Sequence, residues 1–141
     1  MTEQDELVGR LRYSVTRLAR LLRQQDGPGL TPTMAATLAT IGRDGPLTFG
    51  ELAGLEQVAP PTITKVVAKL EAAGLVERRT DPDDGRVRVV RLTAAGRRQL
   101  DANRSRRSAW LRERVAALPE EDRARLADAV AVLERLTEVP R

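Results

Sequence analysis

The chain has 141 residues, a formal net charge of +4 and a pI of about 10.5. It contains no Cys and no His, which excludes disulfides, cysteine nucleophiles, a Ser-His-Asp triad and ordinary zinc sites. With one Trp, one Tyr and one Phe, the core must consist of Leu, Val and Ala, which suits packed helices in a single domain of ordinary size.

The positive charge is concentrated in the second half of the chain. Residues 92–114 carry seven Arg against two acids, and residues 60–91 carry seven Lys or Arg against five acids. This distribution favours a polyanionic partner, although a solvated basic face would have the same composition. No apolar run approaches the ~20 residues of a membrane span. The acidic start lacks the pattern of a signal peptide, so we expect a cytoplasmic protein.

Two helices are predicted before residue 46. The first covers residues 5–25 and is ended by Gly27-Pro28-Gly29. The second has Thr31 as its N-cap, continues to Ile41 and is expected to break at residues 42–46. In the first helix, apolar residues recur at spacings of four and three: Leu7, Leu11, Val15, Leu18 and Leu22.

Residues 48–73 predict a helix–turn–helix. Thr48 and Glu51 have the spacing of a capping box at the start of a helix over residues 49–55. A turn over residues 56–59 leads to a fourth helix over residues 60–73. Its first two residues are prolines, whose missing N–H groups do no harm there.

A β-hairpin is predicted after the fourth helix. Residues 75–79 and 87–92 are its strands, with Val87 and Val89 facing the core and Arg88 pointing out. Thr93 then caps a long helix over residues 94–117, and Pro119 starts a last helix with an acidic first turn. The fold class is therefore mainly α with a small β-hairpin wing (α+β), a winged helix–turn–helix with additional N- and C-terminal helices.

The fourth helix is the candidate for DNA recognition. Its apolar positions can face a core, while Thr62, Lys65 and Lys69 line another side. A helix fits the major groove, and its N-terminal side chains reach base edges. An ordinary amphipathic helix has the same pattern, but the capped helix before it and the hairpin after it favour DNA. The predicted contacts are Thr48, Pro60, Pro61, Thr62, Thr64, Lys65, Lys69, Arg86 and Arg88.

The prolines at the start of this helix affect what it can read. Pro60 and Pro61 stiffen the helix and replace residues that could donate hydrogen bonds. We therefore expect base reading to shift toward Thr62, Thr64 and Lys65.

The hairpin tip carries three acids beside Arg86. Pairing of Asp81 and Asp84 with Arg86 would direct the guanidinium toward a minor groove. The alternative is a solvated turn, because Asp, Pro and Gly are turn formers. A Ca²⁺ site is disfavoured because the loop is short and lacks the further ligands of an EF-hand.

These segments resemble the MarR (multiple antibiotic resistance regulator) family. The matching stretches are residues 59–65, 70–78, 81–86 and 92–96, and the wing tip fits that family's Asp-x-x-Asp-x-Arg signature. The resemblance implies a homodimer whose two recognition helices enter successive major grooves of a near-palindromic operator. It also implies release by a small aromatic or anionic effector, bound between the dimerisation helices and the DNA-binding lobe.

The resemblance divides the single domain, residues 1–141, into a DNA-binding lobe at 31–92 and dimerisation helices at 1–26 and 93–141. Apolar residues of the terminal helices independently favour the dimer, although some could cover the monomer's own core. The predicted interface residues are Leu7, Leu11, Leu18, Leu111, Val115, Leu118, Leu126, Val130 and Leu133. Effector-binding residues are unknown. Tyr13, Arg17 and Trp110 could line a pocket, with core packing as the alternative.

The sequence thus predicts a sequence-specific double-stranded-DNA-binding transcription regulator, a repressor relieved by a small molecule. The alternative is a winged-helix module that binds protein, but its fourth helix would be weakly charged. Without His, Cys or a Gly-rich phosphate loop, we expect no enzymatic activity. No cofactor and no metal site is predicted.

Overall fold

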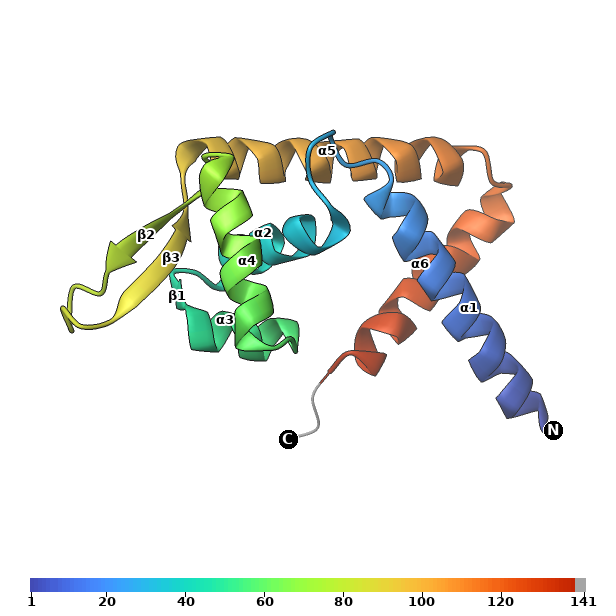
Figure 1. Ribbon diagram of the computed structural model, residues 1–141. Helices are drawn as coiled ribbons and strands as arrows, with labels where there is room; N and C mark the ends of the chain where they lie inside the picture. The colour runs from blue at the N-terminus through green and yellow to red at the C-terminus, as the bar shows by residue number, and fades with distance from the viewer. Residues whose placement is uncertain (139–141) are drawn as a thin grey trace. The chain divides into compact units, whose positions relative to one another are not determined.

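The computed structural model describes residues 1–138, and its elements confirm the predicted fold class (Figure 1). The chain forms two compact units, residues 1–107 and 108–141. The predicted dimerisation range 93–141 ends with residues 139–141, which lie outside the described part. In chain order, the elements are α1 (Glu3–Arg23), α2 (Pro32–Asp44), β1 (Leu47–Thr48), α3 (Phe49–Glu56), α4 (Pro60–Ala72), β2 (Val76–Thr80), β3 (Arg88–Leu92), α5 (Ala94–Ala116) and α6 (Glu120–Leu136).

The hydrophobic core of the first unit lies where α2, α3 and α4 meet the sheet. The predicted inner face of α4 is confirmed, because Ile63, Val67 and Leu70 are fully buried. They pack with Leu38 from α2 and Leu52 from α3. Burial of one such aliphatic side chain contributes about 1.5–3 kcal/mol, so this face holds α4 firmly against the lobe.

The sheet is antiparallel and has three strands in the order β1-β3-β2. The short strand β1 was not predicted, since two residues carry no recognisable alternation. In β3, Val89 is buried and Arg88 is exposed, as expected, whereas Val87 is only half-buried. The fully buried Val90, which pairs with Leu47, was not predicted as a core residue.

Two helix boundaries differ from the prediction. Helix α1 begins at Glu3, because Thr2 and Asp5 form a capping box. Helix α2 continues through Gly42 to Asp44, although a break was expected there. A Cβ on Gly42 would lie 2.4 Å from Leu100 Cδ2, so this glycine permits close packing of α2 on α5 rather than ending the helix.

Helix α5 is fixed to the lobe at its start. The hydroxyl of Thr93 donates to the carbonyl of Gly74 (2.6 Å) and accepts the N–H of Gly96 (3.0 Å). A Cβ on Gly96 would lie only 2.0 Å from the carbonyl oxygen of Leu75. The glycine of the Leu-Thr-x-x-Gly motif therefore lets the first turn of α5 touch the backbone before β2.

Candidate DNA interface

The capping box at the start of α3 is confirmed. Thr48 Oγ1 accepts the N–H of Glu51, and Glu51 Oε1 accepts the N–H of Thr48, both at 3.1 Å. Thr48 also pairs with Val89 in the sheet. Its side chain is half-buried and serves the cap, so a contact of Thr48 with DNA stays a prediction.

The turn between α3 and α4 is held by contacts that the sequence did not reveal. Gln57 ends α3 in the left-handed conformation (φ 55°), and the N–H of Val58 bonds to the carbonyl of Ala53 (3.1 Å). The hydroxyl of the buried Thr40 on α2 donates to the carboxylate of Glu56. These contacts fix the direction in which α4 leaves the turn.

The polar side chains predicted on α4 are all exposed. Thr62, Lys65 and Lys69 recur at i, i+3 and i+7, so they form one stripe on the helix surface. Pro60, Pro61 and Thr64 are exposed as well and lie at the amino end of the helix. The structure therefore brings these six predicted contact residues together on the outer side of α4.

Backbone contacts organise the wing tip. Asp81 Oδ1 accepts the N–H of Asp83 (2.8 Å), and Asp84 Oδ1 accepts the N–H of Arg86 (3.0 Å). Within residues 1–138, no ion pair joins Arg86 to Asp81 or Asp84, so the predicted wing-tip bridge stays a prediction. Arg86 and Arg88 are exposed. In the same described range, no three acidic side chains gather closely enough to hold a metal ion.

A carboxylate between two arginines lies on the wing strands, and sequence reasoning missed it. Glu77 Oε1 accepts from Arg91 Nε (2.6 Å) and from Arg79 Nε (3.2 Å). These hydrogen bonds, that of Arg91 first, hold the pKa of Glu77 below its ordinary value. Only the register of β2 and β3, which places Glu77 opposite Arg91, could have signalled this cluster.

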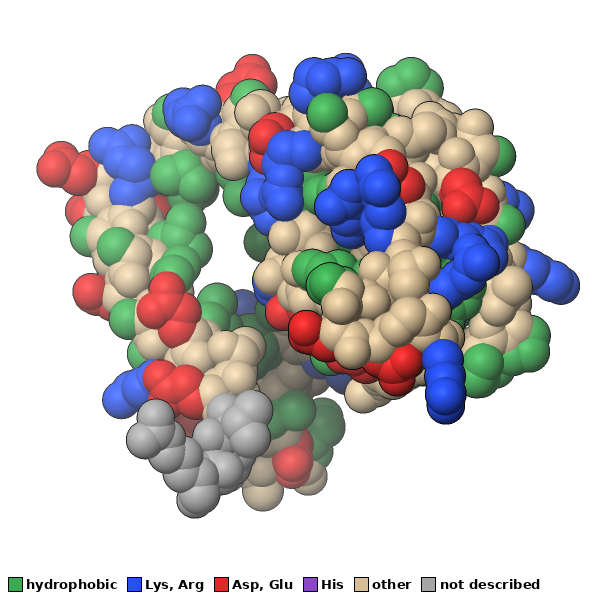
Figure 2. All heavy atoms as spheres, turned by 90° about the vertical axis from the view of Figure 1, so that its left-hand side faces the viewer, with side chains coloured by type: hydrophobic (Ala, Val, Ile, Leu, Met, Phe, Trp, Pro, Cys, Tyr) green, Lys and Arg blue, Asp and Glu red, His purple; other side chains and the backbone are tan. Residues whose placement is uncertain are grey.

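A second arginine contact joins the wing to the helix–turn–helix. Arg78 Nε lies 3.2 Å from a carboxylate oxygen of Glu71 on α4, and its guanidinium lies 5.1 Å from the ring centre of Phe49 on α3. Figure 2 shows the side of the molecule on which the wing lies, where Lys and Arg side chains gather in several clusters with acidic side chains between them. The basic surface is thus divided rather than continuous.

Six of the nine predicted interface residues lie on α1 and α6. Within the described residues, neither α1 nor α6 contains a buried residue. Leu7 is 62% exposed and Leu18 is 45% exposed. Leu118, Leu126 and Val130 are exposed too, whereas the side chains of the remaining four are half-buried: Leu11, Leu111, Val115 and Leu133.

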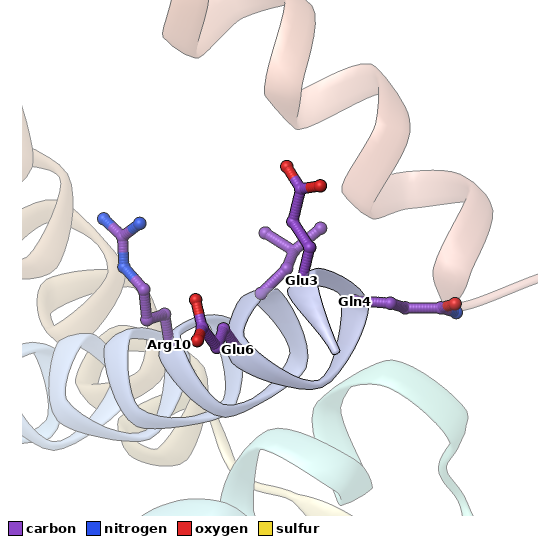
Figure 3. A pocket seen from close by; sticks show the side chains of 5 residues that line it. Glu3, Gln4, Glu6 and Arg10 are labelled. Atoms are coloured by element: carbon purple, nitrogen blue, oxygen red, sulfur yellow. The ribbon is translucent and has the colours of Figure 1, made fainter. Parts of the chain in front are cut away.

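Several hollows lie within the first unit. One of about 260 Å³ is lined by α1, α2 and α5, and a neighbouring one of about 90 Å³ by α2 and α5. They share Ala35, Ala39 and Arg107. Another, about 520 Å³, is lined by residues of α1, and Glu3, Glu6 and Arg10 project around it (Figure 3).

Of the three residues suggested for a pocket, Tyr13 and Arg17 lie on α1. Tyr13 accepts a hydrogen bond from Arg17 (3.4 Å) on α1, and both line a separate hollow of about 210 Å³ with other α1 residues. Trp110 belongs to the second unit, where its ring lies 3.9 Å from the guanidinium carbon of Arg114.

A helix–turn–helix followed by a hairpin wing defines the winged-helix class of DNA-binding proteins. The MarR family profile matches residues 30–87. The chain is 35% identical to the HTH-type transcriptional regulator ML2140 of Mycobacterium leprae, over 99% of this chain and 100% of the relative. The chain belongs to the MarR family and is a DNA-binding transcription regulator.

Two further similarities span nearly the whole chain. A crystal structure of a transcriptional regulator from Pseudomonas aeruginosa PA01 superimposes with a TM-score of 0.86 and 35% identity, covering 99% of this chain and 100% of that one. The transcriptional repressor MdtR of Bacillus subtilis is 26% identical over 98% of this chain and 92% of its own. None of the described helices is long and apolar enough to cross a membrane.

Proposed function

We propose that this regulator is a cytoplasmic, homodimeric repressor that reads a near-palindromic operator and is released by a small aromatic or anionic effector. The observation that supports the proposal most directly is the arrangement of side chains on α4. Its inner face is locked into the core, while Thr62, Lys65 and Lys69 stand exposed on its surface. The similarity to a full-length relative named as a repressor supports the direction of regulation.

The wing supplies the second proposed contact. Arg86 and Arg88 are exposed at and beside the tip, and the bonds of Asp81 and Asp84 to the loop backbone support a defined turn. A guanidinium presented by such a turn suits a narrow minor groove, where negative potential is concentrated. The proposed contacts are thus the α4 residues for the major groove and the wing arginines for the flanking minor groove.

The uncovered helices support the dimer. An apolar side chain that stays in water on folding contributes nothing to the core, yet α1 and α6 present several of them. A second copy of this chain is the occupant we propose, because a two-fold axis would present two α4 helices to a near-palindromic site. We propose that the nine predicted interface residues contact the second copy.

The two neighbouring hollows that share residues of α2 and α5 support the effector. Ala35 and Ala39 give them apolar walls, and Arg23 and Arg104 add positive charge, while Arg107 is paired with Asp26. An aromatic ring beside a carboxylate suits such a lining. We assign these residues to the effector site as part of the proposal.

The first test is a fluorescence-anisotropy titration of the duplex upstream of the protein's own gene, beside a shuffled duplex, at two salt concentrations. We expect saturable preference for the natural duplex and an affinity that falls steeply with salt, because neutralised phosphates release counterions. Thr64→Ala with Lys65→Ala should weaken the natural duplex more than the shuffled one. Equal affinity for both duplexes would contradict operator recognition.

A second titration tests the effector. Aromatic carboxylates are added to the preformed complex, and a fall in anisotropy reports release. Ala39→Phe should fill the hollow and abolish release, whereas Ala102→Phe, at an exposed position of α5, should leave it unchanged. If the aromatic carboxylate releases DNA from both variants equally, the effector binds outside these hollows.

A further inference from the structure

We infer that the amino end of α4 is an apolar reading surface that selects thymine by its C5-methyl group, with the methyl group of Thr64 at its centre. The inference rests on the proposed role of α4 as the helix that enters the major groove. It names the chemical feature of DNA that the helix recognises, the methyl group of thymine. Neither the wing nor the basic side chains of α4 account for recognition of this group.

The first turn of α4 has no free backbone donor. Pro60 and Pro61 carry no N–H, and the N–H groups of Thr62 (2.9 Å) and Ile63 (3.3 Å) both bond to the carbonyl of Ala59. A helix ordinarily presents unpaired N–H groups at this end, and these bind phosphates or other anions. Here that capacity is removed, and two pyrrolidine rings occupy the surface instead.

The side chain of Thr64 is turned in a particular way. Its hydroxyl donates a hydrogen bond to the carbonyl of Pro60, one turn earlier (3.1 Å). Because the hydroxyl donates its proton to the helix backbone, the side chain has no donor left for a base, and its methyl group stays exposed. Thr64 therefore presents an apolar group on the outer side of α4.

The positions around Thr64 extend this surface. Pro61, Thr64 and Ala68 recur at i, i+3 and i+7 and are all exposed, so they lie along one stripe. The stripe of Thr62, Lys65 and Lys69 runs beside it. The outer side of α4 is thus divided lengthwise into an apolar strip and a basic strip.

The two strips match different features of duplex DNA. In the major groove, only thymine carries a methyl group among the four unmodified bases, and small apolar side chains contact it. Lysines bind phosphates or the acceptors of guanine. The apolar strip therefore accounts for discrimination of T·A pairs, whereas the basic strip accounts mainly for affinity.

The test removes one methyl group at a time. Duplexes that bind the full-length protein are selected from a random pool, and each thymine of the selected half-site is then replaced by deoxyuridine. We expect at least one position where this change weakens binding by about threefold to fivefold, the effect of losing one buried methyl group. Thr64→Ser, which keeps the hydroxyl, should bind the thymine and deoxyuridine duplexes equally at that position.

Two variants complete the design. Thr64→Val keeps a methyl group without the hydroxyl and should retain the thymine preference, and Thr33→Ser, at an exposed threonine of α2, should behave as the unchanged protein. If no duplex is selected, operator recognition fails and this inference fails with it. If selection succeeds but deoxyuridine has no effect, or Thr64→Ser keeps the preference, only the inference is overturned.

Discussion

Arg107 donates two hydrogen bonds to Asp26, from Nε to Oδ1 (2.7 Å) and from Nη2 to Oδ2 (2.5 Å). Asp26 follows α1, and Arg107 lies in α5, so the pair joins segments 81 residues apart. Beside it, the buried Asn103 accepts the N–H of Gly27 at 3.1 Å. Together these contacts fix the loop after α1 to α5, and the carboxylate raises the pKa of Arg107.

Removing one partner of this pair should destabilise the protein. The carboxylate of Asp26 is 7% exposed and Arg107 is 36% exposed, so Arg107→Gln leaves a mostly buried charge without its partner. We expect a loss of about 1–3 kcal/mol in the free energy of unfolding, below the value for a fully buried pair. Urea denaturation measures it. Asp101→Asn, which removes the partner of an exposed contact at 4.0 Å, should cost less than about 1 kcal/mol.

Two glycines should respond to alanine in opposite directions. Gly96→Ala places a Cβ against the carbonyl oxygen of Leu75 and should cost about 1–3 kcal/mol through overpacking. Gly54→Ala lies in α3 with open space around its Cβ and should stabilise the protein by about 0.5–1 kcal/mol. Thermal melting of both variants tests the pair, and a stable Gly96→Ala protein would contradict the close approach of α5 to residue 75.

The titration of Glu77 reports its contacts with the arginines. Its folded pKa lies below the ordinary value of 4.5, so its stabilising contribution is present above that value and is lost as the pH falls through the lower folded pKa. Arg91→Gln should move the pKa of Glu77 upward, and Arg79→Gln should move it less. Carboxyl chemical shifts followed by NMR give both midpoints. An unchanged midpoint in Arg91→Gln would show that this contact is absent in solution.

Arg86 should contribute to operator binding beyond its charge. Arg86→Ala is expected to weaken binding by about 1–3 kcal/mol if the side chain enters a groove. Arg125→Ala removes the same charge from α6, where Arg125 lies 3.2 Å from Asp122, and should have a smaller effect. Anisotropy titrations at one salt concentration compare them. If both variants lose the same affinity for the operator, Arg86 contributes only through its charge.

The dimer can be tested on the uncovered helices. Leu18→Glu and Leu126→Glu place charges on α1 and α6, and we expect both to shift sedimentation from dimer toward monomer. Leu55→Glu is the matched control, because Leu55 is 52% exposed but belongs to α3. If the protein without substitutions sediments as a monomer, the proposed dimer is wrong.

Local signals in the sequence predicted most elements of the fold. The capping box of Thr48 and Glu51, the paired prolines of α4 and the turn residues of the wing each define a boundary through neighbours in the chain. Gly42 misled the prediction because its role is contact with Leu100, which lies far away in sequence. The burial of Val90 was missed for the same reason, since Val90 pairs with Leu47, which is distant in sequence.

The candidate site was predicted residue by residue but not in its chemistry. The sequence predicted Thr64 as a DNA contact, yet only the structure shows its hydroxyl bound to the carbonyl of Pro60. The contacts of Glu77 with Arg91 and of Asp26 with Arg107 join residues distant in sequence, for which no local pattern exists.

Thr48 is shared by two parts of the lobe, since it pairs with Val89 of the wing sheet and caps α3. Arg78 adds a second connection, because it contacts both Phe49 of α3 and Glu71 of α4 from the wing. The wing therefore has no hinge of its own against the helix–turn–helix. A mutation that tilts the hairpin should also displace α3 and α4, so the wing and the helix–turn–helix must evolve together.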